Sequence, residues 1–243
     1  MQVAIVSDIH ANRHAFQAVL EDIAAGPAVE VWCLGDVVGY GADPNDCCEL
    51  AREHCAVVLS GNHDLAVTGD LSLEEFSRGA AIAARWTQEV LDRDHVDWLA
   101  SLKPQGEERD VGLFHASPRD PVWEYVLSTL LAELCLDAQD QRICLIGHSH
   151  VALSFTRPDG EPTTGEARRG GESVSIASGE WLINPGSVGQ PRDGDPRAAW
   201  LLLDTATRTA TWQRTTYDVD GAASAIRAAR LPDSLAERLE YGQ

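Results

Sequence analysis

The sequence predicts an α/β protein, and three observations lead to that fold class. Short runs of β-branched and other apolar residues alternate with amphipathic segments over the first 150 residues, which is typical of βαβ units in a parallel sheet. Polar residues flanked by glycine follow several of these runs, at the edge where open α/β sheets bind ligands. Four apolar segments beyond residue 170 indicate antiparallel strands.

Strand–helix units account for the first 64 residues. The apolar run at 3–6 predicts a buried strand. Residues 13–25 place apolar side chains at helical intervals, and Gly26 and Pro27 end that helix. The remaining elements of this part are strands at 29–34 and 55–59 and a helix at 43–53.

Residues 65 to about 105 follow a different pattern. Two amphipathic helices are predicted there, at 74–92 and 96–102, and neither carries a motif with recognisable chemistry. We therefore expect a helical insertion at about 65–105 that shapes one wall of a site formed by other parts of the chain.

The alternation of strands and helices resumes after this segment. No repeat, low-complexity tract or linker interrupts it, so we expect residues 1–243 to form a single domain. A turn-rich loop occupies 184–193. The predicted elements are strands at 111–114 and 143–146, the latter continued at 151–155, a helix at 123–136, antiparallel strands at 173–177, 181–183, 198–203 and 209–215, and helices at 221–230 and 234–239.

Composition excludes several classes of protein. The six cysteines form no Cys-x-x-Cys pair and lie mostly in apolar segments, so we expect reduced core residues in a cytoplasmic protein. No apolar run approaches the roughly 18 residues of a membrane span, and no basic segment precedes the first strand. Because the net charge is −19, a polyanion such as long nucleic acid would be repelled and is not an expected partner.

The polar residues at the strand ends include five of the eight histidines. Asp8 and His10 are two positions apart, and on a strand this spacing points both side chains to one side. Without a cation, so many imidazoles and carboxylates in one place would be costly through repulsion and desolvation. The full set is Asp8, His10, Asp36, Asn62, His63, His115, His148 and His150.

These residue types predict a site for two metal ions. A mixed set of nitrogen and oxygen donors without thiolate suits Mn, Fe, Ni or Zn better than Ca or Mg. The set is larger than one tetrahedral ion needs. Two ions that share one carboxylate would use all of it, at the ~3.5–4 Å separation of two-metal phosphatases. We therefore expect two divalent transition-metal ions, with Mn favoured.

In their order along the chain, these motifs resemble those of the calcineurin-like metallophosphoesterases. The resemblance implies a four-layer αββα sandwich, in which two packed mixed sheets are flanked by helices. The loop at 184–193 extends the likeness to the small bacterial and archaeal phosphodiesterase-like subgroup. The motifs are Asp8-x-His10, Gly35-Asp36, Gly61-Asn62-His63-Asp64, His115 and Gly147-His148-x-His150.

The resemblance also implies a role for each residue of the set. A water or hydroxide between the metals would be the nucleophile. His63 would protonate the departing alkoxide, and Asp64 would orient the His63 ring. The implied ligands are Asp8, His10 and His150 for the first metal, Asn62, His115 and His148 for the second, and Asp36 as the bridge between them.

Three further residues are candidates for binding the substrate, each with an alternative. Asn12 could contact phosphate or the bridging water, or it could cap the helix that begins beside it. Arg119 and Arg192 lie in loops and could clamp a phosphate through two hydrogen bonds. The alternative for both arginines is a surface salt bridge.

The resemblance implies a metal-dependent phosphoesterase, and we expect a phosphodiesterase acting on small soluble substrates. Protein Ser/Thr phosphatases of the superfamily have an arginine shortly after the bridging aspartate. Here Asp36 is followed by Val37-Val38-Gly39-Tyr40-Gly41, without that arginine, so a phosphoprotein substrate is not expected.

The alternatives use the same fold. One is a phosphomonoesterase or a hydrolase of dinucleoside polyphosphates that uses the same site. The other is a non-catalytic interaction module, against which the presence of every ligand and of His63 argues. The sequence leaves open whether the protein forms a homo-oligomer.

Overall fold

Six strands form a mixed sheet, named sheet A, in the computed structural model, which describes residues 1–243. Across the sheet they are, in order, β3 (Val57–Val58), β2 (Glu30–Cys33), β1 (Gln2–Val6), β11 (Ala198–Asp204), β12 (Thr209–Thr215) and β9 (Ser173–Ser175). The three strands from the start of the chain run parallel. β11 joins β1 in antiparallel register and brings the later part of the chain into this sheet.

The remaining six strands form a second mixed sheet, sheet B. Across it they are β4 (Gln105–Glu108), β5 (Val111–Phe114), β6 (Ile143–Leu145), β10 (Glu180–Asn184), β7 (Leu153–Arg157) and β8 (Thr164–Ala167). β5, β6 and β10 run parallel. The expectation that residues 181–183 are purely antiparallel was therefore wrong: β10 is parallel to β6 on one side and antiparallel to β7 on the other.

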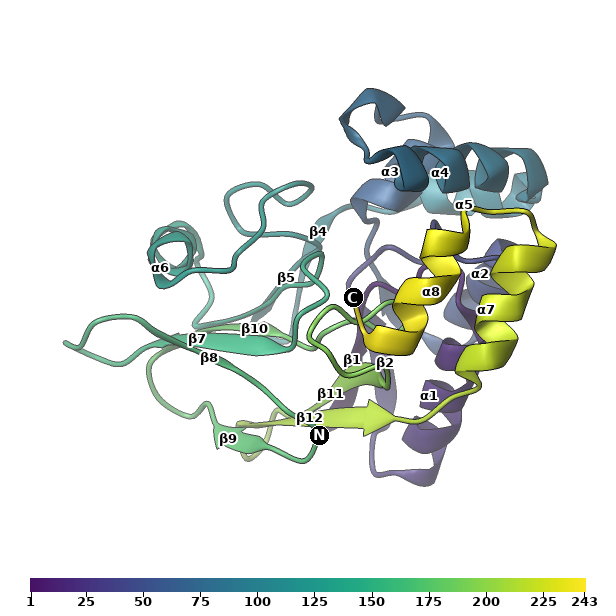
Figure 1. The fold of residues 1–243 in the computed structure, drawn as a ribbon. Coiled ribbons are helices and arrows are strands. Elements are labelled where there is room, and N and C mark those ends of the chain that lie inside the picture. The colour runs from purple at the N-terminus through teal and green to yellow at the C-terminus, as the bar shows by residue number, and fades with distance from the viewer.

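Alternation along the strands produces four layers. On β1, Val3 and Ile5 enter a core between the two sheets, whereas Ala4 and Val6 enter a second core on the outer face of sheet A. A third core covers the outer face of sheet B. Because side chains alternate across a strand, each central strand contributes to two cores. The αββα sandwich is confirmed (Figure 1).

Most of the helices cover sheet A, while one covers sheet B (Figure 1). α6 (Thr129–Ala138) packs its buried face on sheet B through Ala132, Cys135 and Leu136. The helices on the other side are α1 (Arg13–Ala25), α2 (Pro44–His54), α3 (Asn62–Thr68), the 3₁₀ turn η1 (Leu73–Glu75), α4 (Arg78–Val90), α5 (Arg93–Ser101), α7 (Val219–Ala228) and α8 (Asp233–Tyr241).

Several boundaries differ from those predicted. The helix expected at 123–136 begins only at Thr129, because the Ser128 side chain caps it by accepting from the Leu131 amide (3.3 Å). Residues 123–128 are therefore loop. The edge strands β4 and β8 were not predicted, because both are largely exposed and lack apolar alternation. α3 was also not predicted; it begins directly after Gly61.

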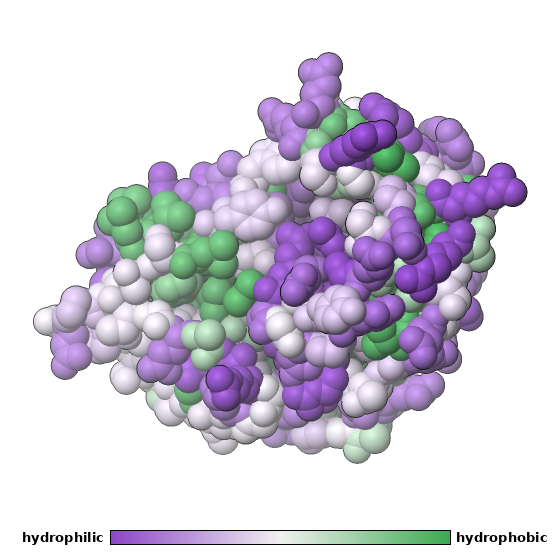
Figure 2. Space-filling view, viewed as in Figure 1, coloured by the Kyte–Doolittle hydropathy of each residue, from purple (hydrophilic) through white to green (hydrophobic).

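The segment at 65–105 is helical, as the sequence indicated, and contains most of α3 together with η1, α4 and α5. That it is an insertion within one domain stays a prediction. None of the helices combines the length and the apolar character that a membrane crossing requires. Figure 2 shows apolar surface gathered over α6, where Leu127, Leu130 and Leu134 are exposed, beside a mainly hydrophilic central face.

Candidate metal centre

The predicted polar residues follow the carboxyl ends of parallel strands from both sheets, with Asn62 and His63 at the start of α3 and the others in loops. Sheet A supplies them after β1, β2 and β3, and sheet B supplies them after β5 and β6. Because the two sheets pack face to face, these ends meet at one edge of the sandwich. Seven residues converge there, and each is at most 3% exposed: Asp8, His10, Asp36, Asn62, His115, His148 and His150.

Five of these residues have a left-handed backbone, with φ between 51° and 63°. Asp8 and His10 do not continue β1, which ends at Val6, so the expected alternation on a strand was wrong. The tight turns, not a pleat, direct both side chains to one point. Each such non-glycine residue costs about 1–2 kcal/mol. The five residues are Asp8, His10, Asp36, His148 and His150.

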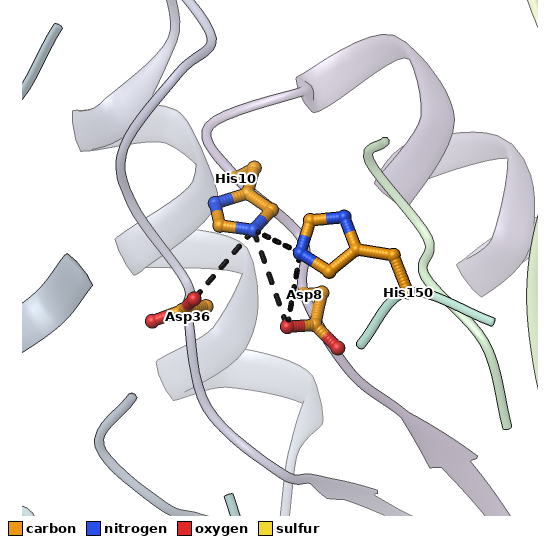
Figure 3. Close-up of side chains that lie close together, drawn as sticks. All are labelled: Asp8, His10, Asp36 and His150. Carbon is orange, nitrogen blue, oxygen red and sulfur yellow. Dashed lines mark hydrogen bonds and ion pairs between the residues drawn. The ribbon is translucent and has the colours of Figure 1, made fainter. Parts of the chain in front are cut away.

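The first cluster contains Asp8, His10, Asp36 and His150, whose ligand atoms all lie within 4.8 Å of one another (Figure 3). Nε2 of His10 is 3.0 Å from Nε2 of His150 and 3.6 Å from Oδ2 of Asp36. Nε2 of His150 is 3.4 Å from Oδ1 of Asp8. These are the four residues predicted for the first metal and its bridge.

The second cluster contains Asp36, His115 and His148, again with ligand atoms within 4.8 Å. Nε2 of His115 lies 3.6 Å from Oδ2 of Asp36 and 3.1 Å from Oδ1 of Asn62. Asp36 therefore belongs to both clusters. The Nε2 atoms of His10 and His115 both lie 3.6 Å from Oδ2 of Asp36. His10 follows a strand of sheet A, and His115 follows a strand of sheet B.

Hydrogen bonds on the far side of three rings fix their tautomers. A carbonyl oxygen can only accept, so the Nδ1 atom that faces it carries the hydrogen. The Nε2 atom of the same ring then presents a free lone pair to the centre, as a metal ligand requires. The pairs are His10 with Val38 O (3.2 Å), His115 with Leu34 O (2.9 Å) and His150 with Gln190 O (2.6 Å).

Two further atoms of the centre have no partner at all. Oδ2 of Asp36 and Nε2 of His148 are buried and make no hydrogen bond. Buried polar atoms without partners are rare and mark a group that something else completes. Buried lone pairs on nitrogen and oxygen, without thiolate, match the donors that divalent transition metals accept. The residues present therefore fit two such cations.

Burial shifts the pKa values of these groups away from their charged forms. It raises the pKa of Asp8 to about 7 and raises that of Asp36 well above its usual value. It lowers the pKa values of His10, His148 and His150 well below 6.5. The histidines are thus neutral at pH 7, and the buried carboxylates need a positive charge nearby.

A comparison with known proteins identifies the family. The model of the calcineurin-like phosphoesterase superfamily domain matches residues 1–208. The chain belongs to this superfamily. It is accordingly a metal-dependent phosphoesterase of a dimetal-dependent family, and its two clusters could each bind a metal.

Similar proteins match this calcineurin-like phosphoesterase along its whole length. An uncharacterized protein of Methanocaldococcus jannaschii is 37% identical over 246 residues, which cover 99% of this chain and 98% of the relative. The crystal structure of a metallophosphoesterase from Sphaerobacter thermophilus has a TM-score of 0.90 and 39% identity, covering 100% and 99% of the two chains. A hypothetical protein from Pyrococcus horikoshii shares the fold, with a TM-score of 0.79 at 19% identity over 100% and 98%.

His63 lies beside the metal centre of this phosphoesterase. Its backbone N–H donates to Oδ1 of Asp36 at 2.8 Å. Its ring packs against Tyr40 and Phe76, with ring centroids 4.4 and 5.1 Å away, and its Nδ1 atom is buried without a partner. Burial lowers the pKa of His63 to about 3. Gly39 (φ 92°) provides room for the ring, because a Cβ there would lie 2.5 Å from Nδ1.

No hydrogen bond joins Asp64 to the His63 ring, whose Nδ1 atom has no partner, so the expectation that Asp64 orients this ring was wrong. Its carboxylate instead accepts from the backbone N–H groups of Gly61 (2.9 Å), Val38 (3.0 Å) and Val37 (3.2 Å). Backbone amides outcompeted the imidazole because Asp64 is the third residue of α3, where a carboxylate commonly caps the helix start. Asp64 therefore ties the loop after Asp36 to α3.

The predicted substrate-binding residues have different surroundings. Asn12 caps α1 by accepting from the Ala15 amide (3.1 Å), and its Nδ2 donates to Gly189 O (2.9 Å). Capping, one of its two alternatives, is thus what this side chain does. Arg119 pairs with Glu124 at 3.0 Å, which is the salt-bridge alternative. Arg192 pairs with no carboxylate and lies beside the centre.

A cleft of about 340 Å³ opens next to the metal centre, and Asn62, His63 and Arg192 contribute to its walls. Other wall residues were not predicted as functional. Trp123 was assigned to a helix, and Arg238 lies in the last helix, far from every motif. The signal that could have revealed Trp123 is weak: a Trp-x-Tyr pair just after the His115 loop. No sequence signal marks Arg238.

Proposed function

We propose that this protein is a two-metal phosphodiesterase for small phosphate esters. The observation that carries the proposal is the position of Asp36, whose carboxylate belongs to both clusters at once. One site would be held by Asp8, His10 and His150. The other would be held by His115 and His148, which follow strands of sheet B, together with Asn62. Asp36 would bridge the two. We propose divalent transition-metal ions for both sites, with manganese favoured. Donors of nitrogen and oxygen only suit Mn, Fe, Ni and Zn.

Two bound divalent cations would supply Lewis-acid charge to the phosphoryl oxygens and would lower the pKa of a water molecule. The reaction then forms a bond from the water oxygen to phosphorus and breaks the bond from phosphorus to the leaving alcohol. Arg192 lines the cleft beside the centre and would bind a phosphate group of the substrate. Its guanidinium has no carboxylate partner and can donate hydrogen bonds to phosphate oxygens.

His63 is the proposed general acid, which donates a proton to the leaving alkoxide. It lines the cleft and touches Asp36 through its backbone, so it lies between the metal centre and the space for the leaving group. The low pKa of its ring reflects burial, with the positive charge of Arg192 as the next cause. A bound phosphate ester would add negative charge beside both groups and would oppose this lowering of the pKa.

Three features favour small substrates. The cleft is confined, at about 340 Å³. No arginine follows Asp36 at the position that protein phosphatases use, because Tyr40 occupies it. The net charge of −19 opposes the binding of long nucleic acid.

We propose that the protein is cytoplasmic, because its cysteines are unpaired and mostly buried.

The deciding experiment compares two chromogenic esters after reconstitution of the protein with Mn²⁺. We expect bis(p-nitrophenyl) phosphate, a diester, to be hydrolysed with a higher kcat/KM than p-nitrophenyl phosphate, a monoester. Faster hydrolysis of the monoester would overturn the phosphodiesterase assignment in favour of a phosphatase. Failure to hydrolyse either ester, with metal bound, would contradict the catalytic proposal and favour an interaction module.

Substitution of His63 tests its role. We expect His63→Ala to slow esters with poor leaving groups by about a hundredfold or more, and p-nitrophenyl esters much less, because p-nitrophenolate needs no proton. His54→Ala, at an exposed histidine of α2, is the control. An equal loss on all leaving groups would assign His63 a structural role.

A further inference from the structure

The cleft beside the metal centre contains more binding groups than a single phosphate needs. Its volume of about 340 Å³ is in the range of small-molecule sites. One end of the cleft is formed by Asn62 and His63, at the metal centre. Two arginines and a group of aromatic rings line most of the rest, together with Glu75 and a few small or neutral residues. The positive charges of the arginines and the aromatic side chains together indicate what kind of molecule binds in the cleft.

The two arginines share one acceptor. Nη2 of Arg192 donates to Oε1 of Gln190 at 3.0 Å, and Nη1 of Arg238 donates to the same oxygen at 3.2 Å. The Nε atoms of both side chains are buried without a partner. Burial and the charge of Arg192 lower the pKa of Arg238. Two like charges held together without a counter-ion, in a protein of net charge −19, form a site for an anion.

Gln190 also fixes where this anion site lies relative to the metal centre. Its backbone carbonyl accepts from Nδ1 of His150 at 2.6 Å, while its side chain holds both guanidinium groups. A single residue therefore separates a metal-centre histidine from the arginine pair. An anion on the arginines would be a neighbour of the phosphate at the metals, not the same group.

Aromatic rings form the other part of the cleft. Phe76 and Trp123 meet at a centroid distance of 5.1 Å and an angle of 62°. Tyr125 packs on His148 at 4.0 Å and 30°, and 45% of the tyrosine is exposed. The space between them has ring surfaces available for a flat apolar group, which aromatic side chains bind by stacking. Tyr125 also lies beside Arg192, whose positive charge opposes the rise that burial causes in the pKa of its phenol.

We propose that this cleft selects nucleotides that carry a second phosphate: the base contacts Trp123 and Phe76, and the second phosphate binds Arg192 and Arg238. The inference rests on the proposed phosphodiesterase function, because it places the scissile phosphate at the metal centre. It adds a substrate class, and it assigns Arg238 a role in specificity. Gln190 is the positioning residue that keeps the two guanidinium groups together.

The test measures inhibition of bis(p-nitrophenyl) phosphate hydrolysis, and binding by calorimetry, in buffered excess Mn²⁺. The probes are ribose 5-phosphate, AMP, ADP and adenosine 3′,5′-bisphosphate. We expect at least one of the two-phosphate nucleotides to bind about tenfold or more tighter than AMP, because an added charge-assisted contact is worth that factor. We expect AMP to bind tighter than ribose 5-phosphate, which lacks the base.

Variants separate the two parts of the cleft. Arg238→Met should remove the gain from the second phosphate, and Arg238→Lys should keep most of it. Trp123→Leu should make AMP bind no tighter than ribose 5-phosphate. The two-phosphate nucleotides should still bind tighter than AMP to this variant. Arg227→Met is the matched control, because Arg227 on α7 is paired with Asp233 at 2.6 Å outside the cleft.

Two outcomes would overturn the inference. One is equal binding of AMP and both two-phosphate nucleotides by the wild-type protein. The other is an unchanged ratio of their affinities in Arg238→Met when thermal unfolding shows that the variant is folded. If the wild-type protein does not hydrolyse the diester, the proposed function fails, and the calorimetric ratios still decide whether the cleft binds the second phosphate.

Discussion

Nε2 of His10 lies 3.0 Å from Nε2 of His150, although 140 positions separate the two residues in the sequence. Both Nδ1 atoms donate to carbonyl oxygens, so neither Nε2 carries a hydrogen and two lone pairs face each other. This contact is unfavourable unless a cation lies between the nitrogens and the adjacent carboxylates. The fold therefore holds its ligands in place at a cost that a bound metal offsets.

Metal addition should stabilise the protein more at about pH 8.5 than at about pH 6.5. In the metal-free protein, burial raises the pKa of Asp8 from 3.8 to about 7. A group whose pKa is raised on folding adds stability below its unfolded pKa, and this stability is lost as the pH rises through its folded pKa. The histidines do not oppose this trend, because their lowered pKa values leave them neutral above pH 6.5.

Thermal unfolding with and without Mn²⁺, after treatment with a chelator, measures this effect. We expect the increase in Tm to be larger at the higher pH by about 2 °C, because a pKa of about 7 leaves a difference of about 1 kcal/mol between the two pH values. An equal increase at both pH values would show that Asp8 does not titrate with metal binding.

Asp36→Asn should abolish turnover while the fold is kept. An amide cannot supply the negative charge that two cations share, so we expect kcat to fall about a thousandfold and the metal content to drop below that of the wild type. Metal analysis, circular dichroism and diester hydrolysis measure the three quantities. Asp140→Asn, at an exposed residue outside the centre, is the control. Full activity in Asp36→Asn would contradict the two-metal proposal.

Asp64→Ala should destabilise the protein by roughly 3 kcal/mol, because three backbone N–H groups lose a buried carboxylate acceptor. Urea unfolding provides the measurement. Asp70→Ala, at the end of the same segment, removes only an exposed acceptor of the Thr68 hydroxyl and should cost less than about 1 kcal/mol. Similar losses in the two variants would mean that the loop after Asp36 does not depend on Asp64.

Gly39→Ala and Gly69→Ala form a matched pair, because both glycines have φ of 92°. A Cβ at Gly39 would lie 2.5 Å from Nδ1 of His63, whereas a Cβ at Gly69 would meet nothing within 4 Å. Both variants carry the strain of a left-handed alanine, about 1 kcal/mol. Only Gly39→Ala should also lower kcat/KM for the diester, by about tenfold or more, with metal content unchanged. Equal activities would exclude a catalytic contribution of the His63 position.

The sequence predicted which polar side chains converge, because these residues follow the ends of parallel strands. The strand ends were visible as apolar runs followed by Asp36, His115 or His148, and their convergence follows from the topology of a parallel sheet. The ends of α1 were also predicted, because local residues set them: Asn12 caps the start of the helix and Gly26 ends it.

Features that depend on tertiary contacts were not predicted. Nothing near Arg238 in the sequence indicates that Gln190 lies beside it, because the two residues are 48 positions apart. Trp123 has the apolar character of a helix face and instead forms part of the cleft. The partner of Asp64 was misassigned because His63 is its neighbour in the sequence. In the folded protein the Asp64 carboxylate instead accepts from the backbone N–H of Val38, which lies in another loop.

The pairing of β1 with β11 has a consequence for how the protein reaches its native state. Gln2 is in register with Asp204, so the first strand made by the ribosome waits for a partner synthesised about 200 residues later. Contacts of such high sequence separation slow folding. The same holds for the first cluster, because Asp8 and His10 of the first loop meet His150 only after β6 has been made. We therefore expect this cluster to be completed late in folding.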